Sequence, residues 1–328
     1  MFRTPGRWPR RAAIGLLPLA LLVSACSGSG ASSSTSTSGS DAGSSGAASG
    51  GGVTIDQAAY DAVINAAPVA DAATVDALAW AKTIKDRGVL NTGGSDSGPL
   101  FSLLDPATGK VTGFDAGLAQ MLARYIIGEP KIQLTVTTVD TRETLIQNGT
   151  VDTVVATYSI TEPRAEKVAF AGPYFTSGAA IMVKKDNTDI NSVKDLDGKT
   201  VATQAASTGV TALQEHAPGA TVSTFDTDAA CQAAVTQGRV DAYVIDQSIL
   251  ISDAVVNQEV KVVGEPFTSD PYGIGVTKDD PAVKTFVNDW LQSIYDDGTW
   301  AKLWKVTVGT VVAGDAPEPP KIGSVPGT

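Results

Sequence analysis

An arginine near the start of a predicted helix is the residue of this chain with the clearest potential for chemistry. Residues 151–155 are typical of a buried strand and residues 161–163 of a helix N-terminus, which places Arg164 near the third helical position. The free N–H groups of a first turn already carry partial positive charge, so a cation is unfavourable there. We expect a bound anion to compensate it. The alternative is an arginine that extends into solvent or pairs with Glu162 or Glu166.

Two other polar points fall at the ends of predicted elements. Ser207 and Thr208 begin a predicted helix after a strand candidate at 199–202, and Asp246 ends a strand predicted from alternating apolar residues. In open α/β sheets, ligands bind at the carboxyl ends of strands, where helix N-termini present N–H groups. Arg164 can hold a carboxylate, the two hydroxyls can add donors to it, and Asp246 can accept from an ammonium group. The set predicts a zwitterion site, although Ser207, Thr208 and Asp246 would also be ordinary helix caps.

The elements that must position these residues alternate between strands and helices, which predicts an α/β architecture with largely parallel sheets. The clearest helices begin at Phe114 and Pro281, and each carries an apolar stripe. Three tryptophans follow in or after the second of these helices. We expect them in a core rather than around a ligand; they are Trp290, Trp300 and Trp304.

Few residues are suited to other chemistry. The chain has one histidine, His216, with no ligand at metal-binding spacing, so we expect no metal, no cofactor and no catalytic residue. Cys231, at helical spacing after a predicted cap at Asp228, is interpreted as a buried thiol. A net charge of −11 argues against nucleic acid as a partner.

The N-terminus is typical of an exported protein. Basic residues precede an apolar stretch of about twelve residues, and small residues then lead to Cys26. This stretch is shorter than the roughly 20 residues of a membrane-spanning helix. Residues 23–26 resemble a bacterial lipobox, which implies cleavage of a signal peptide at 1–25 and lipidation of Cys26. The alternative is an ordinary secreted protein with an incidental cysteine.

Several segments of the chain resemble the polar amino-acid group of the bacterial solute-binding proteins, family 3, which serve ABC importers. The match extends from about residue 84 to 304, and its SIT-x-x-R segment is specific. The closest resemblance is to actinobacterial glutamine/glutamate-binding lipoproteins. The segments are GFDAGLAQMLA at 113–123, VDTVVATYSITEPRAEKVAFAGPYF at 151–175, GRVDAYVIDQS at 238–248, PYGIGVTKDD at 271–280 and DDGTWAKLW at 296–304.

The resemblance implies a two-lobed, periplasmic-binding-protein-like fold of type II, with two crossover hinge strands. Composition adds a Ser/Gly-rich tether, a helical extension of unassigned role and a disordered Pro-rich tail. The predicted parts are the signal peptide at 1–25, the tether at 26–52, the extension at 53–83, lobe one at 84–176 and 271–312, lobe two at 180–266, and the tail at 313–328.

The resemblance also implies roles for individual residues. Arg164 would bind the ligand α-carboxylate with Thr157 and Ser159 beside it, and Asp246 would bind the α-ammonium group. Ser207 and Thr208 would belong to a turn in which alanine, at position 206, replaces the family's usual glycine.

The ligand side chain would be read partly by the loop at 91–101, where Ser95 and its neighbours offer hydroxyls, amides and one carboxylate, Asp96. Glutamate, glutamine, aspartate and asparagine therefore all remain open, and strongly basic ligands have less support.

These features predict a lipid-anchored, monomeric receptor on the extracytoplasmic face of the cell membrane, which closes on a polar amino acid and delivers it to an ABC permease. We expect no enzymatic activity. One alternative is an amino-acid sensor for a membrane signalling partner, and a more remote one is an enzyme that resembles cyclohexadienyl dehydratase.

Overall fold

The computed structural model of the protein describes residues 55–328. The predicted signal peptide, the lipidation site at Cys26 and the tether lie outside the described residues. Within 55–328, no helix combines the length and the apolar character needed to cross a bilayer.

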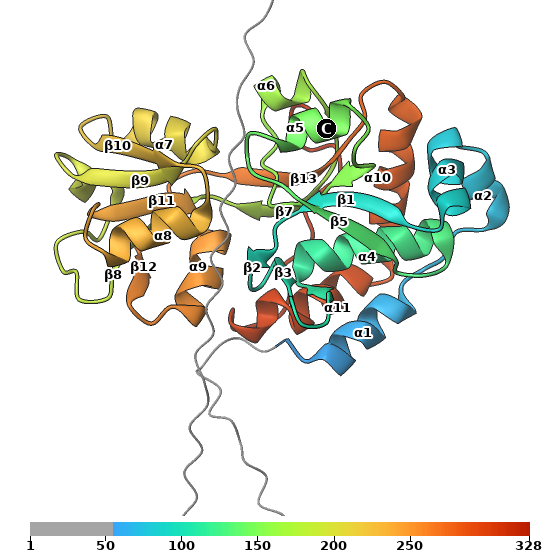
Figure 1. The fold of residues 1–328 in the computed structure, drawn as a ribbon, viewed down its shortest axis with the longest axis horizontal. Helices are drawn as coiled ribbons and strands as arrows, with labels where there is room; N and C mark the ends of the chain where they lie inside the picture. Colours follow the sequence, from blue (N-terminus) through green and yellow to red (C-terminus); the bar gives the residue numbers. More distant parts are fainter. Residues whose placement is uncertain (1–54) are drawn as a thin grey trace, which may run out of the picture. The chain divides into compact units, whose positions relative to one another are not determined.

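Two sheets organise the described chain (Figure 1). The first has the order β5-β1-β6-β13-β7, with β1 parallel to β5 and β6, and β13 antiparallel to β6 and β7. We call the part of the chain built on this sheet lobe one. Its strands are β1 (Leu90–Gly94), β5 (Ile132–Val136), β6 (Thr153–Val154), β7 (Ala169–Ser177) and β13 (Asp270–Val276).

The second sheet has the order β10-β9-β11-β8-β12, and the part built on it is lobe two. Here β9 is parallel to β10 and β11, while β8 is antiparallel to β11 and β12. The strands are β8 (Ala179–Lys184), β9 (Thr200–Gln204), β10 (Thr221–Phe225), β11 (Ala242–Asp246) and β12 (Val260–Val263). The predicted α/β, two-lobed fold is therefore confirmed.

The chain crosses between the lobes twice, at β7 to β8 and at β12 to β13. Ser177 at the end of β7 pairs with Asp270 at the start of β13, so the two crossings run side by side (Figure 1). Two crossings are the arrangement that allows hinge closure of two lobes around a ligand.

Helices cover both sheets, and a small sheet of β2 (Ser97–Gly98), β3 (Ser102–Leu104) and β4 (Val111–Thr112) lies in lobe one. The helices of lobe one are α4 (Phe114–Ile127), α5 (Arg142–Gln147), α6 (Glu162–Ala165), α10 (Pro281–Asp296) and α11 (Thr299–Val306). Those of lobe two are α7 (Thr208–His216), α8 (Asp228–Thr236) and α9 (Gln247–Val256), and 3-10 helices occur at Val193–Leu196 and Val308–Thr310.

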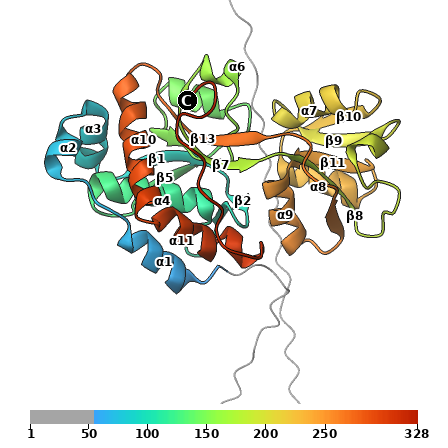
Figure 2. The same ribbon diagram turned by 180° about the vertical axis from the view of Figure 1, so that it is seen from behind.

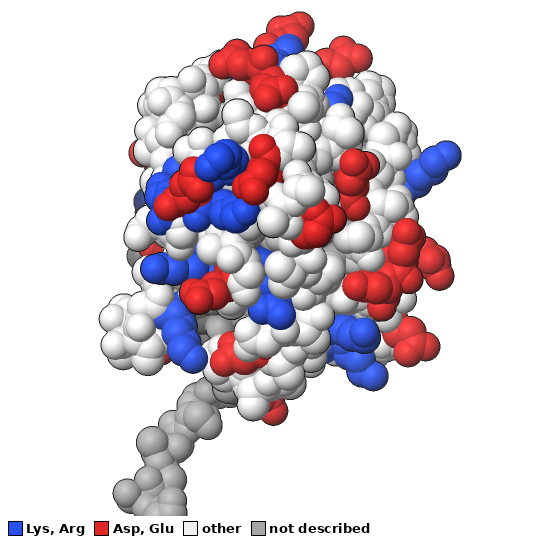
Figure 3. Space-filling model, turned by 90° about the vertical axis from the view of Figure 1, so that its right-hand side faces the viewer, with Lys and Arg blue, Asp and Glu red and all other residues white. Residues whose placement is uncertain are grey.

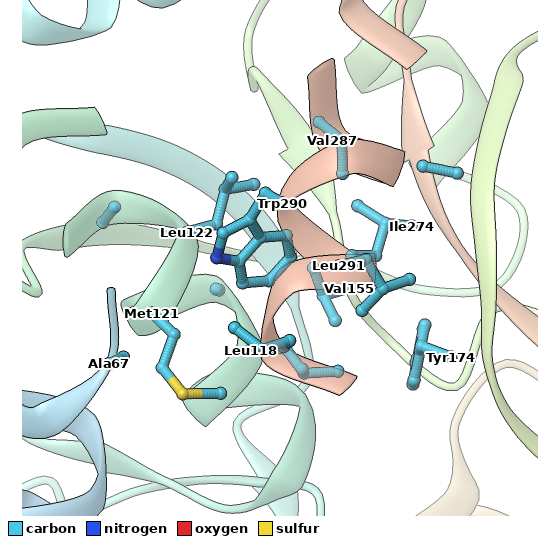
Figure 4. Close-up of a cluster of buried hydrophobic side chains, with 14 of the residues drawn as sticks. Ala67, Leu118, Met121, Leu122, Val155, Tyr174, Ile274, Val287, Trp290 and Leu291 are labelled. Carbon is cyan, nitrogen blue, oxygen red and sulfur yellow. The ribbon is translucent and has the colours of Figure 1, made fainter. Parts of the chain in front are cut away.

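The core of lobe one lies where α4 and α10 meet the first sheet. Figure 4 shows Leu118 and Leu122 of α4 beside Trp290 of α10, whose side chain is fully buried. Trp300 and Trp304 are buried in the same cluster, which agrees with their predicted place in a core. Removing an aromatic side chain of this kind costs about 3–5 kcal/mol, so this packing holds the sheet that carries the site in place.

The segment before β1 adds three helices to lobe one, α1 (Gln57–Ala66), α2 (Ala72–Asp76) and α3 (Ala79–Arg87) (Figure 2). Their apolar residues, among them Tyr60, Ile64 and Ile84, are buried in the same core as α4 and α10. The Tyr60 hydroxyl donates to the Gly113 carbonyl at 3.1 Å, which ties α1 to the start of α4.

The C-terminal segment differs from the disordered tail that its composition predicts. Residues 313–328 form no helix or strand, but the Gly323 N–H donates to the Gly172 carbonyl at 2.9 Å. Val325 packs against the apolar cluster that contains Ile160 and Tyr158. A few apolar side chains and one backbone bond fix a Pro-rich segment that local composition alone would leave unstructured.

Candidate functional site

A cavity between the two lobes brings together every residue that the sequence predicted for ligand binding. Its volume is about 180 Å³, below the roughly 300–1,000 Å³ typical of pockets for drug-sized ligands. This size suits a small solute. The predicted residues on its walls are Ser95, Thr157, Ser159 and Arg164 of lobe one and Ser207, Thr208 and Asp246 of lobe two.

Arg164 is the third residue of α6 and is only 7% exposed. One guanidinium nitrogen, Nη1, donates to the Ser159 carbonyl at 2.8 Å, and Nη2 donates to the Ala206 carbonyl of lobe two at 3.1 Å. The Nε atom lies 4.0 Å from Glu143 Oε1. Both alternatives considered from the sequence, an arginine in solvent or one paired with Glu162 or Glu166, are therefore wrong. Because few hydrogen-bond acceptors face the five N–H donors of Arg164, the cation retains capacity for an anion.

The Ala206 carbonyl that accepts from Arg164 belongs to a tight turn that leads into α7. Ala206 adopts a left-handed conformation with φ of +58°, which is unfavourable for a residue with a Cβ atom and explains why glycine would suit the position. Ser207 follows as the N-cap of α7, but its hydroxyl donates to the Gln204 carbonyl at 2.7 Å rather than capping the helix. Ser207 and Thr208 line the cavity at the start of α7, next to the Ala206 carbonyl that accepts from Arg164, and a helix start of this kind stabilises a carboxylate.

Asp246 ends β11 at the base of α9 and is 4% exposed. Its Oδ1 atom is buried without a hydrogen-bond partner among the described residues. Burial and the nearby Asp270 raise the pKa of Asp246 to about 7, although Arg164 and Arg142 act in the opposite direction. A buried carboxylate that lacks a partner is costly, so this position favours a cationic hydrogen-bond donor.

The backbone beside Arg164 is fixed by a buried carboxyl group. Thr157 has a positive φ of 43°, and its N–H donates to Asp115 Oδ2 at 2.6 Å. Tyr174 donates to the other oxygen of Asp115 at 2.9 Å. Ser159 is 3% exposed and bridges to Tyr272 of β13, so the polar exit of the β6 strand is held rigidly.

Ser95 lies in the loop before β2, where the Ser102 hydroxyl donates to its carbonyl at 2.5 Å. This loop carries no cation at 91–101, as the sequence indicated.

Sequence reasoning missed a second arginine in the cavity, Arg142. It is the first residue of α5 and 4% exposed, and its guanidinium lies over the Tyr158 ring at 3.8 Å from the centroid. Nη1 donates to the Ala156 carbonyl at 3.1 Å, while Nε has no partner among the described residues. Burial and Arg164 lower the pKa of Arg142 to about 9, so the group stays charged at neutral pH. A cation in a first helical turn was the signal that identified Arg164, and it applies equally here.

Two carboxyl groups of lobe two were also missed. Asp228 and Asp253 line the cavity from α8 and α9. The sequence suggested Asp228 as a helix cap, but the cap of α8 is Thr227, whose hydroxyl accepts from the Ala230 N–H. Within residues 55–328, no group of three or more His, Cys, Asp or Glu side chains could hold a metal ion.

Charged groups on the outside of the protein are arranged differently from those in the cavity. Figure 3 shows basic and acidic side chains interspersed on one face, without a broad field of one sign. In the cavity, by contrast, both arginines come from lobe one, and the charged residues that lobe two contributes are all carboxylates.

Comparison with known proteins gives a consistent result. A model of the bacterial extracellular solute-binding proteins, family 3, matches residues 90–307. The ABC transporter glutamine-binding protein GlnH of Bacillus subtilis is 36% identical over 224 residues, which cover 68% of this chain and 82% of that protein. The glutamate-binding protein GluB of Corynebacterium glutamicum is 34% identical over 236 residues, covering 68% of this chain and 80% of GluB.

Solved structures extend the comparison to the fold. An ancestral arginine-binding protein bound to glutamine matches with a TM-score of 0.62 and 36% identity, covering 68% of this chain and 99% of that one. The ancestral amino acid-binding protein AncCDT-1, described as a precursor of cyclohexadienyl dehydratase, matches with a TM-score of 0.63 and 36% identity, covering 69% and 97% of the two chains.

Proposed function

This chain belongs to family 3 of the bacterial extracellular solute-binding proteins, and we propose that it captures a polar amino acid outside the cytoplasm and delivers it to an ABC importer. In this proposal the ligand binds between the lobes, and its α-carboxylate and α-ammonium groups contact opposite walls of the cavity. The family consists of solute-binding proteins, and no chemical step is needed for this activity.

The observation that carries the proposal is that Arg164 of lobe one and Asp246 of lobe two line the same small cavity. Arg164 brings a buried guanidinium from lobe one, and Asp246 brings from lobe two a buried carboxylate with one oxygen that has no partner within residues 55–328. The α-carboxylate of an amino acid would supply an anion to Arg164, and its α-ammonium group would supply a cation to Asp246. The hydroxyls of Ser159 and Thr208 and the N–H groups at the start of α7, which Ser207 positions as its N-cap, would complete the carboxylate site.

Contacts between the lobes support a binding cycle of opening and closure. Arg164 donates to Ala206, the Leu100 N–H donates to Ser252 Oγ at 3.0 Å, and Ser248 Oγ lies 2.8 Å from the Tyr272 hydroxyl. A ligand that touches both walls stabilises the arrangement in which these bonds form, and it thereby shifts the population toward the closed form that a permease would engage.

The place of the protein in the cell follows from the same proposal. Solute-binding proteins of this family act outside the cytoplasm. We propose in addition that Cys26 carries the lipid anchor, that residues 26–52 form the tether, and that the receptor acts as a monomer. Mass spectrometry of the membrane fraction would detect the acylated Cys26 peptide, and a Cys26→Ala variant should leave the membrane.

Calorimetric titration of the purified protein with each of the polar amino acids tests the proposed function. We expect at least one of glutamine, glutamate, asparagine and aspartate to bind with 1:1 stoichiometry and to raise the melting temperature, because a ligand that binds only the folded state adds RT ln(1 + [L]/Kd) to its stability. If no amino acid binds, the proposal fails.

A further inference from the structure

Two carboxyl groups lie next to each other at the wall that lobe two contributes to the cavity. Asp228, at the start of α8, accepts hydrogen bonds from the Tyr243 hydroxyl at 2.8 Å and from Gln232 Nε2 at 2.7 Å. Asp253, on α9, is 2% exposed, and its Oδ2 atom has no partner among the described residues except the neighbouring carboxyl of Asp228. Burial raises the pKa of both groups, and Asp228 raises that of Asp253 further.

Two adjacent buried carboxyl groups do not both ionise readily, so the pair holds a proton between them when no ligand cation or donor is present. In that state the pair carries about one negative charge, which a hydrogen-bond donor or a cation would stabilise. Both Asp228 oxygens already accept hydrogen bonds, so the acceptor without a partner among the described residues is Asp253 Oδ2. Here Asp228 and Asp253 both line the cavity that contains Arg164 and Asp246.

The segment at 91–101 of lobe one contacts α9 of lobe two next to Asp253. The Leu100 N–H bonds to Ser252, the residue before Asp253, so the loop at 91–101 meets α9 directly. That loop contains no lysine or arginine that could neutralise the pair. Arg142, elsewhere on the lobe-one wall, lies over the Tyr158 ring and donates to the Ala156 carbonyl, and its charged neighbours are Glu143, Asp246, Asp115 and Arg164.

We propose that the Asp228–Asp253 pair receives the end of the ligand side chain and selects side chains that end in N–H donors, a carboxamide or a cation, over carboxylates of the same length. The inference rests on the proposed function, because it assigns the subsite beyond Arg164 and Asp246. An N–H group donates directly to the carboxylate oxygens of the pair. A ligand carboxylate would instead meet like charge in a buried site, or would require uptake of a second proton.

Titration calorimetry with isosteric ligands tests this assignment. We expect the wild-type protein to bind glutamine more tightly than glutamate, asparagine more tightly than aspartate, or lysine or arginine more tightly than all four, with a preference of at least about tenfold (about 1.4 kcal/mol). Tightest binding of an amide identifies a carboxamide ligand, and tightest binding of lysine or arginine identifies a cationic one.

Variants of the pair show whether it causes the preference. In Asp228→Asn and Asp253→Asn, and more strongly in the double variant, the ratio of donor-bearing to acidic ligand should fall toward one, because an amide tolerates a carboxylate beside it. Asp186→Asn, an exposed residue outside the cavity, serves as the control and should keep the wild-type ratio. Circular dichroism reports whether each variant is folded.

Three results would overturn the inference. Tighter wild-type binding of glutamate or aspartate than of every donor-bearing ligand would exclude the proposed selectivity while leaving the amino-acid receptor intact. An unchanged ratio in folded Asp228→Asn and Asp253→Asn variants would show that the pair does not read the side chain. A protein that binds no amino acid would remove the proposed function and this inference together. The titrations of the wild-type protein can contradict the proposal without any variant, so a variant that fails to fold does not prevent the test.

Discussion

The two walls of the cavity differ in their charged groups: both arginines come from lobe one, which also contributes Asp96 and Asp115, whereas lobe two contributes carboxyl groups alone among its charged lining residues. Lobe one contributes two guanidinium groups, Arg142 and Arg164, from the first turns of short helices, and both lie over the face of Tyr158. Lobe two contributes carboxyl groups at the end of a strand and on two helices. A single small zwitterion can satisfy both walls only when the lobes come together, so the separation of charge couples ligand capture to closure.

The largest change should follow from removing the principal cation of lobe one. Arg164→Ala leaves the ligand carboxylate without its partner in a buried site, which costs about 2–5 kcal/mol, a loss of roughly thirtyfold to several thousandfold in affinity. Calorimetry measures this loss. Arg239→Ala, at an exposed arginine outside the cavity, is the matched control. Wild-type affinity in Arg164→Ala would contradict the charge assignment of lobe one.

The corresponding change in lobe two should be smaller. Asp246→Asn keeps the shape of the side chain and removes its charge, and a hydrogen bond to a charged group contributes about 1.5–3 kcal/mol, or roughly tenfold to 150-fold in affinity. The same titration, with the amino acid found to bind best, measures it. If Asp246→Asn lost more affinity than Arg164→Ala, lobe two rather than lobe one would make the larger contribution to ligand affinity.

Acidification should weaken lobe two selectively. The pKa of Asp246 is raised to about 7 in the ligand-free protein, and the ligand ammonium needs the ionised carboxylate. The contribution of Asp246 to affinity should therefore be nearly constant above this pKa and fall as the pH drops through it, by about tenfold between pH 8 and pH 6. Titrations in a pH series measure the slope. In Asp246→Asn this dependence should be lost, and a pH dependence that persists there would assign it to another group such as Asp115.

The smallest effect should come from the aromatic ring that the two arginines share. Tyr158→Leu removes a π face from both guanidinium groups, which should cost ~0.5–1 kcal/mol, or roughly two- to fivefold in affinity. Tyr158→Phe is the matched control, since it keeps the ring and deletes only a hydroxyl that has no partner among the described residues. Equal affinities in the two variants would show that the ring does not position the cations.

The sequence predicted the two-lobed fold and the part of the site that has local signals. Arg164, Ser207 and Asp246 each stand where a predicted strand or helix begins or ends, so their convergence at one edge follows from the rules of α/β sheets. The exact lobe boundaries and the roles of these residues stay predictions.

The place of Asp228 and Asp253 in the cavity and the order of the C-terminal segment could not be predicted, because the local sequence of each has an ordinary interpretation. Asp228 in a first helical turn is an ordinary cap, and nothing near it in sequence indicates that Asp253, one helix later, lies against it. The prolines of the C-terminal segment predict disorder, yet Val325 packs against the apolar cluster that contains Ile160. In both cases the decisive contact joins residues that are distant along the chain, which composition and spacing do not report.

The bond from Arg164 to the Ala206 carbonyl has a kinetic consequence. The same guanidinium that would hold the ligand carboxylate also fastens lobe one to lobe two, so separating the lobes and weakening the grip on the ligand are one event rather than two in succession. The residence time of the amino acid should then equal the lifetime of the closed form. A permease that pulls the lobes apart would release the cargo at that moment, without having to compete for it.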